Sequence, residues 1–465
     1  MANVSFGGLI TGIDTASIVS QLMNLERAPQ KLMQAQQARN KDKIAAYQKI
    51  EDALTSLQNL AKGFNKQSTF SSVKTTVANS SVLSATASAS APPGTHSVQV
   101  TSLAKNERQV STGVASKTDL LFGTGSFTID GGAAITIGAG QNSLQGIANA
   151  INASGFDVSA SIINDGTNYR LVINGKDTDN HTFDFTGLGG SAPTLLGGAD
   201  PTYQSASLAQ LVVDGVAITG TSNTITDAIQ GVTLNLASEG ASTTLTIATD
   251  TDAVTKKISD FVSAYNSVNS LISSQTRYDE STKSAGILSG DSALRTIQSQ
   301  LKSLLTKTVS GATGSYDTLA QIGIKSDSKT GALSIESSKL SSALSNDYDN
   351  VVDYFTHNGD SLASLPANQY GIAQQFNLII ETMVHPYVSG MSNNGLLESK
   401  KNSLNVANTQ LDKQIESLEE RLAKMESNLR AQYNRMETAV SMLQTQGNML
   451  LSSLGALSNY SSSNK

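Results

Sequence analysis

Histidines and closely spaced aspartates are the residues of this 465-residue chain that could support acid–base or metal chemistry. The histidines are His96, His181, His357 and His385. No two of them have the spacing of metal ligands on one element. Because the chain has no cysteine, zinc-thiolate sites, disulfides and cysteine nucleophiles are excluded. Each histidine is therefore interpreted as a surface or turn residue.

The one acidic cluster consists of Asp177, Asp179 and Asp184, whose carboxylates are the ligand type that calcium prefers. An EF-hand loop also needs a glycine at its sixth position and a distal glutamate, and neither is present in register. The preceding Gly175 and Lys176 lack the upstream glycine and the hydroxyl residue of a phosphate loop. No G-x-S-x-G elbow occurs either. The sequence therefore predicts no enzymatic site, no metal and no cofactor.

The bulk composition excludes other classes of protein. The formal net charge is −6 and the pI is near 5.3, without a stripe of lysine and arginine, so no nucleic-acid partner is expected. No stretch approaches the roughly 18 apolar residues of a membrane span, so no membrane insertion is expected. The first ten residues contain neither lysine nor arginine, which argues against a Sec-type signal. At roughly 150 residues per domain, the length suggests about three domains.

Helical periodicity marks both ends of the chain, which must position any functional surface. Apolar residues at helical spacing begin at Ile18 and are interrupted by Pro29, and a second seam runs from Ile50 to Phe64. After Asp252 the helical period returns. A strand pair is expected between residues 322 and 335, followed by two short helices.

The middle of the chain, from about residue 71 to residue 250, has an apolar period of two and is predicted to be rich in β-strands. It holds a hairpin near residues 162–173 and a weak internal repeat. The two copies, 127–151 and 212–229, each contain an Asp-Gly turn and then a segment interpreted as a capped helix. Convergent similarity is an alternative, since Asp-Gly turns are common.

A heptad repeat near the C-terminus is the clearest pattern in the chain. It spans five consecutive heptads with apolar residues at positions a and d, and Gln432 breaks the d row. The predicted coiled-coil seam consists of Leu404, Leu411, Ile415, Leu418, Leu422, Met425, Leu429, Met436 and Leu443. Because such a seam needs a partner helix, the sequence predicts a non-enzymatic, self-assembling structural protein.

Four parts of the chain resemble the bacterial flagellar filament cap family (FliD, hook-associated protein 2). Residues 8–29, which begin Gly-Leu-Ile-Thr-Gly-Ile-Asp, are similar to the amino-terminal signature of the family. The internal repeat resembles the "IN" motif of flagellin and hook proteins. Residues 286–295 and 319–333 resemble family segments, and the helix 404–443 resembles the carboxy-terminal coiled coil.

The resemblance implies a multidomain α+β fold, in which a terminal helical coiled coil and a helical leg domain flank an inserted β-rich head of two small domains. The expected domains are 1–42, the N-terminal helical part of the terminal domain; 43–70 with 251–400, the helical leg domain; 71–110 with 205–250, the inner head domain; 111–204, the outer, inserted head domain; and 401–465, the C-terminal coiled coil that completes the leg and terminal domain.

The resemblance also implies a function. Such a protein forms a structural cap at the distal tip of the flagellar filament, where it retains exported flagellin and promotes its polymerisation and filament elongation. It leaves the cell by type III export and acts outside it. The implied partners are further copies of the chain in a homo-oligomeric ring, a pentamer or another number, together with flagellin, the hook–filament junction protein and a dedicated export chaperone.

Two other functions stay open at this point. The β-rich head could act as a tip adhesin that binds mucus or a host surface. Alternatively, the chain could be another axial protein of the flagellum, such as a hook–filament junction protein.

Overall fold

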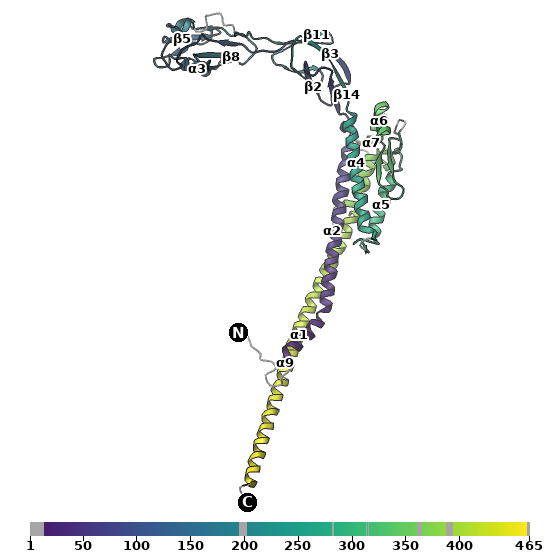
Figure 1. The fold of residues 1–465 in the computed structure, drawn as a ribbon. Coiled ribbons are helices and arrows are strands. Elements are labelled where there is room, and N and C mark those ends of the chain that lie inside the picture. Colours follow the sequence, from purple (N-terminus) through teal and green to yellow (C-terminus); the bar gives the residue numbers. More distant parts are fainter. Residues whose placement is uncertain are drawn as a thin grey trace. The chain divides into compact units, whose positions relative to one another are not determined.

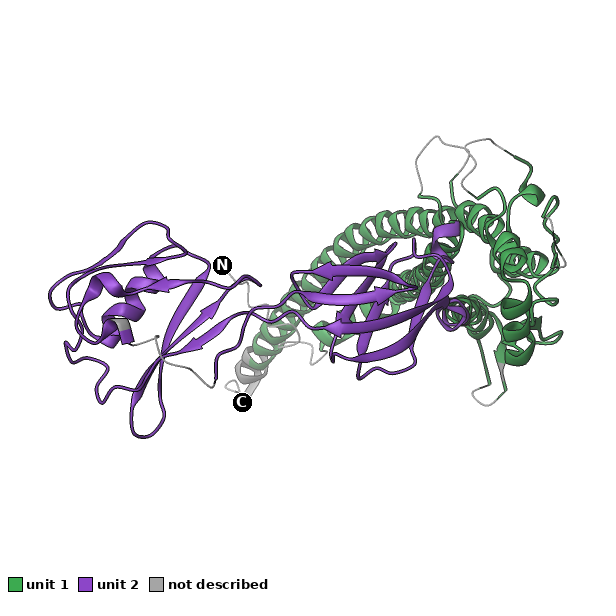
Figure 2. Ribbon diagram, turned by 90° about the horizontal axis from the view of Figure 1, so that it is seen from above, with its two compact units in different colours: residues 1–66, 257–465 green, residues 67–256 purple. Residues whose placement is uncertain are grey.

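The computed structural model has helices at both ends of the chain and strands in the middle, which confirms the expected α+β class (Figure 1). It divides into two compact units (Figure 2): unit 1 comprises residues 1–66 and 257–465, and unit 2 comprises residues 67–256. The residues that the structure describes are 14–194, 202–280, 283–312, 314, 316–359, 365–386 and 394–462. The first six residues of the amino-terminal signature, 8–13, lie outside them. None of the described helices is long and apolar enough to cross a membrane.

Unit 1 is helical and is formed by both ends of the chain. Its helices are α1 (Thr15–Glu26), α2 (Ala28–Phe64), α4 (Thr251–Thr276, which begins in unit 2), α5 (Ser292–Leu304), α6 (Ser337–Asn346), α7 (Tyr348–Thr356), α8 (Ile372–Val384) and α9 (Leu396–Ser462). Two small hairpins pair β15 (Tyr278–Asp279) with β16 (Ser284–Ala285), and β17 (Ile324–Ser326) with β18 (Leu333–Ile335). The second hairpin and the helices α6 and α7 confirm the strand pair and the two short helices that the sequence predicts.

The break between α1 and α2 follows from the residues at their ends. The Asp14 side chain caps α1 by accepting the Ser17 N–H at 2.9 Å. Helix α2 then starts with Pro29 in its first turn, where the missing N–H of proline leaves no helical bond unmade. The interruption predicted at Pro29 is therefore confirmed.

The core of unit 1 lies where α8 meets α2, α5, α7 and α9. The second half of α2 presents Ile50, Leu54 and Leu57, which are completely buried. Aromatic rings join α8 to α4, since Phe376 meets Phe261 edge to face with 5.1 Å between ring centroids. The spacing of apolar residues along α2 thus becomes the face that holds the helices together.

Unit 2 contains two hydrophobic cores, and we name the surrounding structures lobe A and lobe B. The strands of lobe A are β1 (Val73–Val77), β2 (Leu83–Ala87), β3 (Gly94–Ser102), β10 (Ala209–Val213), β11 (Val216–Gly220), β12 (Thr224–Ile229), β13 (Val232–Leu236) and β14 (Ala241–Thr249). They form two antiparallel sheets, in the orders β1-β14-β3-β10-β11 and β12-β13-β2. Alternate residues such as Val98, Val100 and Leu245 point into an aliphatic core.

Lobe B is smaller and carries one helix, α3 (Leu144–Ala153). Its strands are β4 (Arg108–Val110), β5 (Gly125–Ile129), β6 (Ile135–Ile137), β7 (Val158–Asn164), β8 (Tyr169–Gly175) and β9 (Phe183–Asp184), in the orders β4-β8-β7 and β6-β5-β9. The β7–β8 hairpin confirms the one predicted near residues 162–173. Helix α3 is capped as predicted, because Ser143 Oγ accepts the Gly146 N–H at 3.1 Å.

The prediction of a second capped helix, in the later copy of the repeat, is wrong. Residues 224–229 form strand β12, which pairs with β13 so that Ile225 lies opposite Leu234. Residues four positions apart, such as Ile225 and Ile229, share one face of a strand as well as of a helix, so their spacing could not decide. The β-branched Thr224 and Thr226 favour the strand, and pairing with β13 completes it.

Candidate assembly interface

The predicted seam lies on α9, and α1 and α2 pack beside this helix (Figure 1). Val19 and Met23 of α1 are buried against Leu418 and Leu422 of α9 in a small apolar cluster. Four buried side chains make a far smaller core than the one around α8. The contact between α1 and α9 is therefore held by little apolar area.

The seam residues divide into three groups by exposure. Leu418 and Leu422 are buried; Leu404, Leu411, Ile415, Met425 and Leu429 are partly buried; Met436 and Leu443 are exposed. A single chain thus brings the middle of the seam against α1 and leaves its C-terminal end uncovered.

Polar side chains, which a search for apolar spacing misses, join α2 to α9. The hydrogen bonds run from Gln30 Nε2 to Glu419 Oε1 at 2.5 Å, from Gln37 Nε2 to Asp412 Oδ1 at 2.6 Å, and from Asn40 Nδ2 to Asn408 Oδ1 at 2.9 Å. We call this set the polar stretch. The glutamines and asparagine of α2 were the signal, because amides at helical spacing can bond across two helices.

Next to the polar stretch, a cluster of charged side chains also joins α2 to α9. Lys401 of α9 contacts the carboxylates of Glu51 on α2 and Glu398 on its own helix, and it donates to Gln48 Oε1 at 2.7 Å. Burial alone lowers the pKa of Lys401, but the two glutamates outweigh it and raise that pKa. The lysine is therefore charged, and a shift of helix register would leave buried charges unpaired.

The end of α9 exposes a series of large apolar side chains. Each is more than 60% exposed, and they are Met442, Leu443, Met449, Leu450, Leu451 and Leu454. Leu25 and Leu32 are exposed in the same way on α1 and α2. A group of large exposed apolar side chains near one helix end is typical of an interaction surface.

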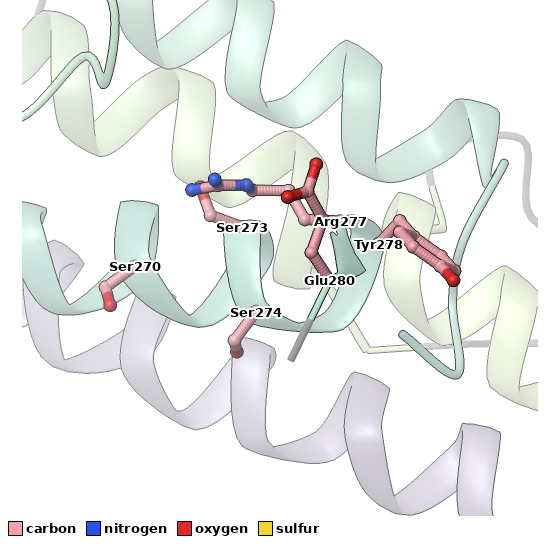
Figure 3. A pocket seen from close by; sticks show the side chains of 6 residues that line it. All are labelled: Ser270, Ser273, Ser274, Arg277, Tyr278 and Glu280. Carbon is pink, nitrogen blue, oxygen red and sulfur yellow. The ribbon is translucent and has the colours of Figure 1, made fainter. Parts of the chain in front are cut away.

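A hollow in unit 1, at the end of α4, has a volume of about 520 Å³ (Figure 3). Its lining consists of Ser270, Ser273, Ser274, Arg277, Tyr278 and Glu280. Arg277, Tyr278 and Glu280 are exposed to solvent. The charged and aromatic side chains of the hollow are therefore in contact with water rather than enclosed.

The structure places a carboxylate beside each histidine, and these pairs are His96 with Asp214, His181 with Asp130 and Asp177, His357 with Asp353, and His385 with Glu381. The interpretation of His181 as a surface or turn residue is wrong as to its exposure, because its side chain is only 7% exposed. Of the acidic cluster, Asp177 contacts His181, whereas Asp184 accepts the Thr186 N–H at 2.9 Å. Within the described ranges, no three such side chains converge as metal ligands.

Comparison with known proteins finds similarity to flagellar hook-associated protein 2. The family models for the flagellar hook-associated protein 2 N-terminus and C-terminus match residues 11–107 and 206–445. Flagellar hook-associated protein 2 of Escherichia coli K12 is 32% identical over 97% of this chain and 98% of its own length. The B-type flagellar hook-associated protein 2 of Pseudomonas aeruginosa PAO1 is 29% identical over 93% of this chain and 94% of its own.

A solved structure agrees with these matches. The crystal structure of the flagellar cap protein FliD D1-D2-D3 domains from Escherichia coli is similar with a TM-score of 0.52 and 33% identity. The match covers 77% of this chain and 99% of that one. The two family models together span more than half of the chain. The chain therefore belongs to the flagellar hook-associated protein 2 family, the structural family of the flagellar cap protein FliD.

Proposed function

We propose that the protein is the structural cap at the distal tip of the flagellar filament, where it retains exported flagellin and promotes its polymerisation. Membership of the family supports this role. The observation in the structure that carries it is the exposed apolar end of α9, which a single chain leaves uncovered. A cap must attach itself to a growing polymer, and an uncovered seam is a surface suited to attachment.

The seam acts by coupling attachment to helix order. An isolated helix is marginal in water, and most of its stability in a protein comes from packing of an apolar face. The end of α9 gains that packing when another copy or a filament subunit covers Leu443 and its neighbours. Weak contacts repeated around a ring can release and rebind one at a time, so the cap stays attached while each flagellin enters beneath it.

We also propose a role for each part of the chain and the partners that it contacts. The terminal domain, residues 1–42 with part of 401–465, contacts the filament, and the leg, residues 43–70 with 251–400, links it to the two head domains, 71–110 with 205–250 and 111–204. The protein acts without catalysis. Its partners are further copies in a pentameric or other ring, flagellin, the hook–filament junction protein, and an export chaperone that binds the C-terminal region.

Charge placed in the seam tests the proposal. Leu418→Asp is expected to weaken filament attachment while unit 2 stays folded, because Leu418 lies in the small cluster between α1 and α9. Leu443→Asp is the sharper variant, since Leu443 is 65% exposed and its loss breaks no described contact of the single chain. Both strains are expected to lose motility and to release unpolymerised flagellin into the medium.

The matched control is Asn448→Asp, which adds the same charge at an exposed position five residues further along α9, off the a and d rows. Tip occupancy is counted by immunogold electron microscopy, and the control is expected to match wild type. Normal motility and tip occupancy in Leu443→Asp would contradict the proposal. Negative-stain microscopy of the purified protein tests the ring, and a strictly monomeric protein at all concentrations would argue against it.

The other candidate functions receive no support. The 32% sequence identity to flagellar hook-associated protein 2, over 97% of the chain, favours the cap over another axial protein. No observation on the described residues favours an adhesin.

A further inference from the structure

The Asp-Gly turns of the two repeat copies, one in each lobe of unit 2, make the same set of hydrogen bonds. Asp130 and Asp214 both have positive φ, 54° and 50°, and a glycine follows each. Each carboxylate bonds the ring of a histidine and the backbone N–H of the hydroxyl residue after it. The bonds are Asp130 Oδ2 to His181 Nδ1 at 2.8 Å and Oδ1 to Thr182 N at 2.7 Å, and Asp214 Oδ2 to His96 Nδ1 at 2.7 Å and Oδ1 to Ser97 N at 2.8 Å.

His181 differs from His96 in the carboxylates around it. Its Nε2 lies 3.1 Å from Asp177 Oδ1, and its backbone N–H donates to Glu107 Oε2 at 2.6 Å. Both ring nitrogens of His181 therefore face carboxylates. A neutral imidazole carries one N–H and one lone pair, whereas the imidazolium donates from both nitrogens. The geometry around His181 thus favours the protonated ring.

The His181 loop also holds the two segments that enter lobe B. These segments, 105–108 and 202–207, pair with each other through the bridges Lys105–Ser207 and Arg108–Gln204, and we call them the connector. The loop reaches both of them, because His181 N–H bonds Glu107 and Asn180 Oδ1 accepts the Ala206 N–H at 2.7 Å. Glu107 is buried and anchored further by Gln109 Nε2 at 2.7 Å.

We propose that protonated His181 is a pH-sensitive lock that ties the connector to lobe B. The imidazolium bridges Asp130 of the β5–β6 turn and Asp177 of its own loop, and so holds that loop in the conformation that presents His181 N–H and Asn180 to the connector. This device goes beyond the cap role and does not depend on it.

The ionisable groups that face His181 fix the direction of the pH effect. They are Asp130, Asp177 and Glu107; in the connector, burial and then the charge of Glu107 raise the pKa of Tyr203. Burial alone lowers the pKa of His181, but the hydrogen bonds and charges of Asp130 and Asp177 outweigh it, so the pKa is raised. Burial raises the pKa of Asp130, but His181 and the Thr182 N–H outweigh that effect, and the pKa is lowered.

The lock therefore forms only below a certain pH, which is set by the pKa of His181 in the folded protein. An unfolded histidine has a pKa of about 6.5, so the stabilisation is fully present below about pH 6.5. It is lost as the pH rises through the raised pKa of folded His181, because the neutral ring turns a lone pair toward one carboxylate. The lock is therefore closed below about pH 6.5, down to the pH at which the Asp130 carboxylate takes up a proton, and it opens as the pH rises through the raised pKa of His181.

Titration of the full-length protein tests the lock. With ¹³C-labelled histidine the chain gives four imidazole signals, which His→Gln variants assign. The His181 midpoint is expected above about 6.5. It is expected to fall in Asp177→Asn, a variant of a surface carboxylate that keeps the fold. A His181 midpoint at or below about 6.5 would overturn the proposal.

Hydrogen exchange measures whether the connector responds. The protection factors of the amides in 105–108 and 202–207, each relative to the unfolded chain at the same pH, are expected to fall about tenfold across the His181 titration, the effect of one charge-assisted hydrogen bond. In His181→Gln they are expected to be low and independent of pH. The matched control is His96→Gln, in which the connector should behave as in wild type. An identical pH response in wild type and His181→Gln would also overturn the proposal, and Asp177→Asn supplies the same comparison if His181→Gln does not fold.

Discussion

The second half of α2 and the end of α9 both carry apolar residues at helical spacing, yet they have opposite surroundings. Ile50, Leu54 and Leu57 of α2 are completely buried in the helical core of unit 1. Leu443 and Leu450 of α9 are 65% and 63% exposed. The comparison teaches that apolar spacing reveals that a face needs a partner, whereas the fold decides whether that partner lies in the same chain.

The largest effect is expected from a cavity in the leg core. Leu54→Ala removes a completely buried side chain from α2 and is expected to lower the free energy of unfolding of unit 1 by about 3–4 kcal/mol. Urea denaturation followed by circular dichroism at 222 nm measures the loss. Leu32→Ala is the control on the same helix, because Leu32 is 69% exposed and should cost less than about 0.5 kcal/mol. Equal effects of the two variants would refute the distinction.

The next effect comes from the charges that hold α2 to α9. Lys401→Ala leaves the carboxylates of Glu51 and Glu398 without their cation, and about 2–3 kcal/mol of stability should be lost. Adding Glu51→Ala removes one of the stranded charges and should restore part of that loss in the same urea experiment. If the double variant is as unstable as the sum of the two single ones, the charges do not act as a unit.

A smaller effect is expected in the cluster where α1 meets α9. Leu422→Ala should cost about 1–2 kcal/mol, because its cluster is small and solvent can reach the site. The loss is local, so it should appear as faster hydrogen exchange of the α1 amides rather than in the unfolding of the leg. Leu450→Ala, at an exposed position of the same helix, should leave α1 exchange unchanged. Faster exchange in both variants would mean that the end of α9 is covered within one chain.

The smallest effect is expected at an exposed ion pair on α9. Arg430 contacts Glu426 at 2.8 Å across one helical turn. Arg430→Ala should change stability by about 0.3 kcal/mol, and less in high salt, since solvent screens such pairs. Thermal melts in low and high salt measure it. A loss above about 1 kcal/mol would place Arg430 in an interface that the single chain does not contain.

Much of the fold could be predicted because local residues decide it. The helix break at Pro29, the β7–β8 hairpin and the Ser143 cap of α3 each depend on a few neighbouring residues. Strand β12 could not be predicted in the same way. Its two isoleucines fit a helix or a strand, and strand β13, further along the chain, supplies the partner that decides.

The sequence predicted which residues line the candidate interface on α9, but not which residues they contact. The heptads identify the α9 face, but the polar stretch pairs residues some 370–390 positions apart, such as Gln37 with Asp412, and such pairs follow only from the folded register. The burial of His181 was missed for a similar reason. Its carboxylate partner Asp130 lies 51 residues away along the chain, in the turn between β5 and β6.

The length of α9 has a mechanical consequence. Its 67 residues, at about 1.5 Å of rise each, form a rod of roughly 100 Å. Its first turns, around Leu397 and Lys401, are buried in unit 1, and α1 and α2 support it as far as Tyr433, while the large apolar side chains near its end are exposed. Beyond Tyr433 roughly 45 Å of helix remains, so a rotation of about 5° there displaces the tip by about 4 Å. The length of the helix thus converts a small rotation at its supported part into a displacement of several ångströms at its tip.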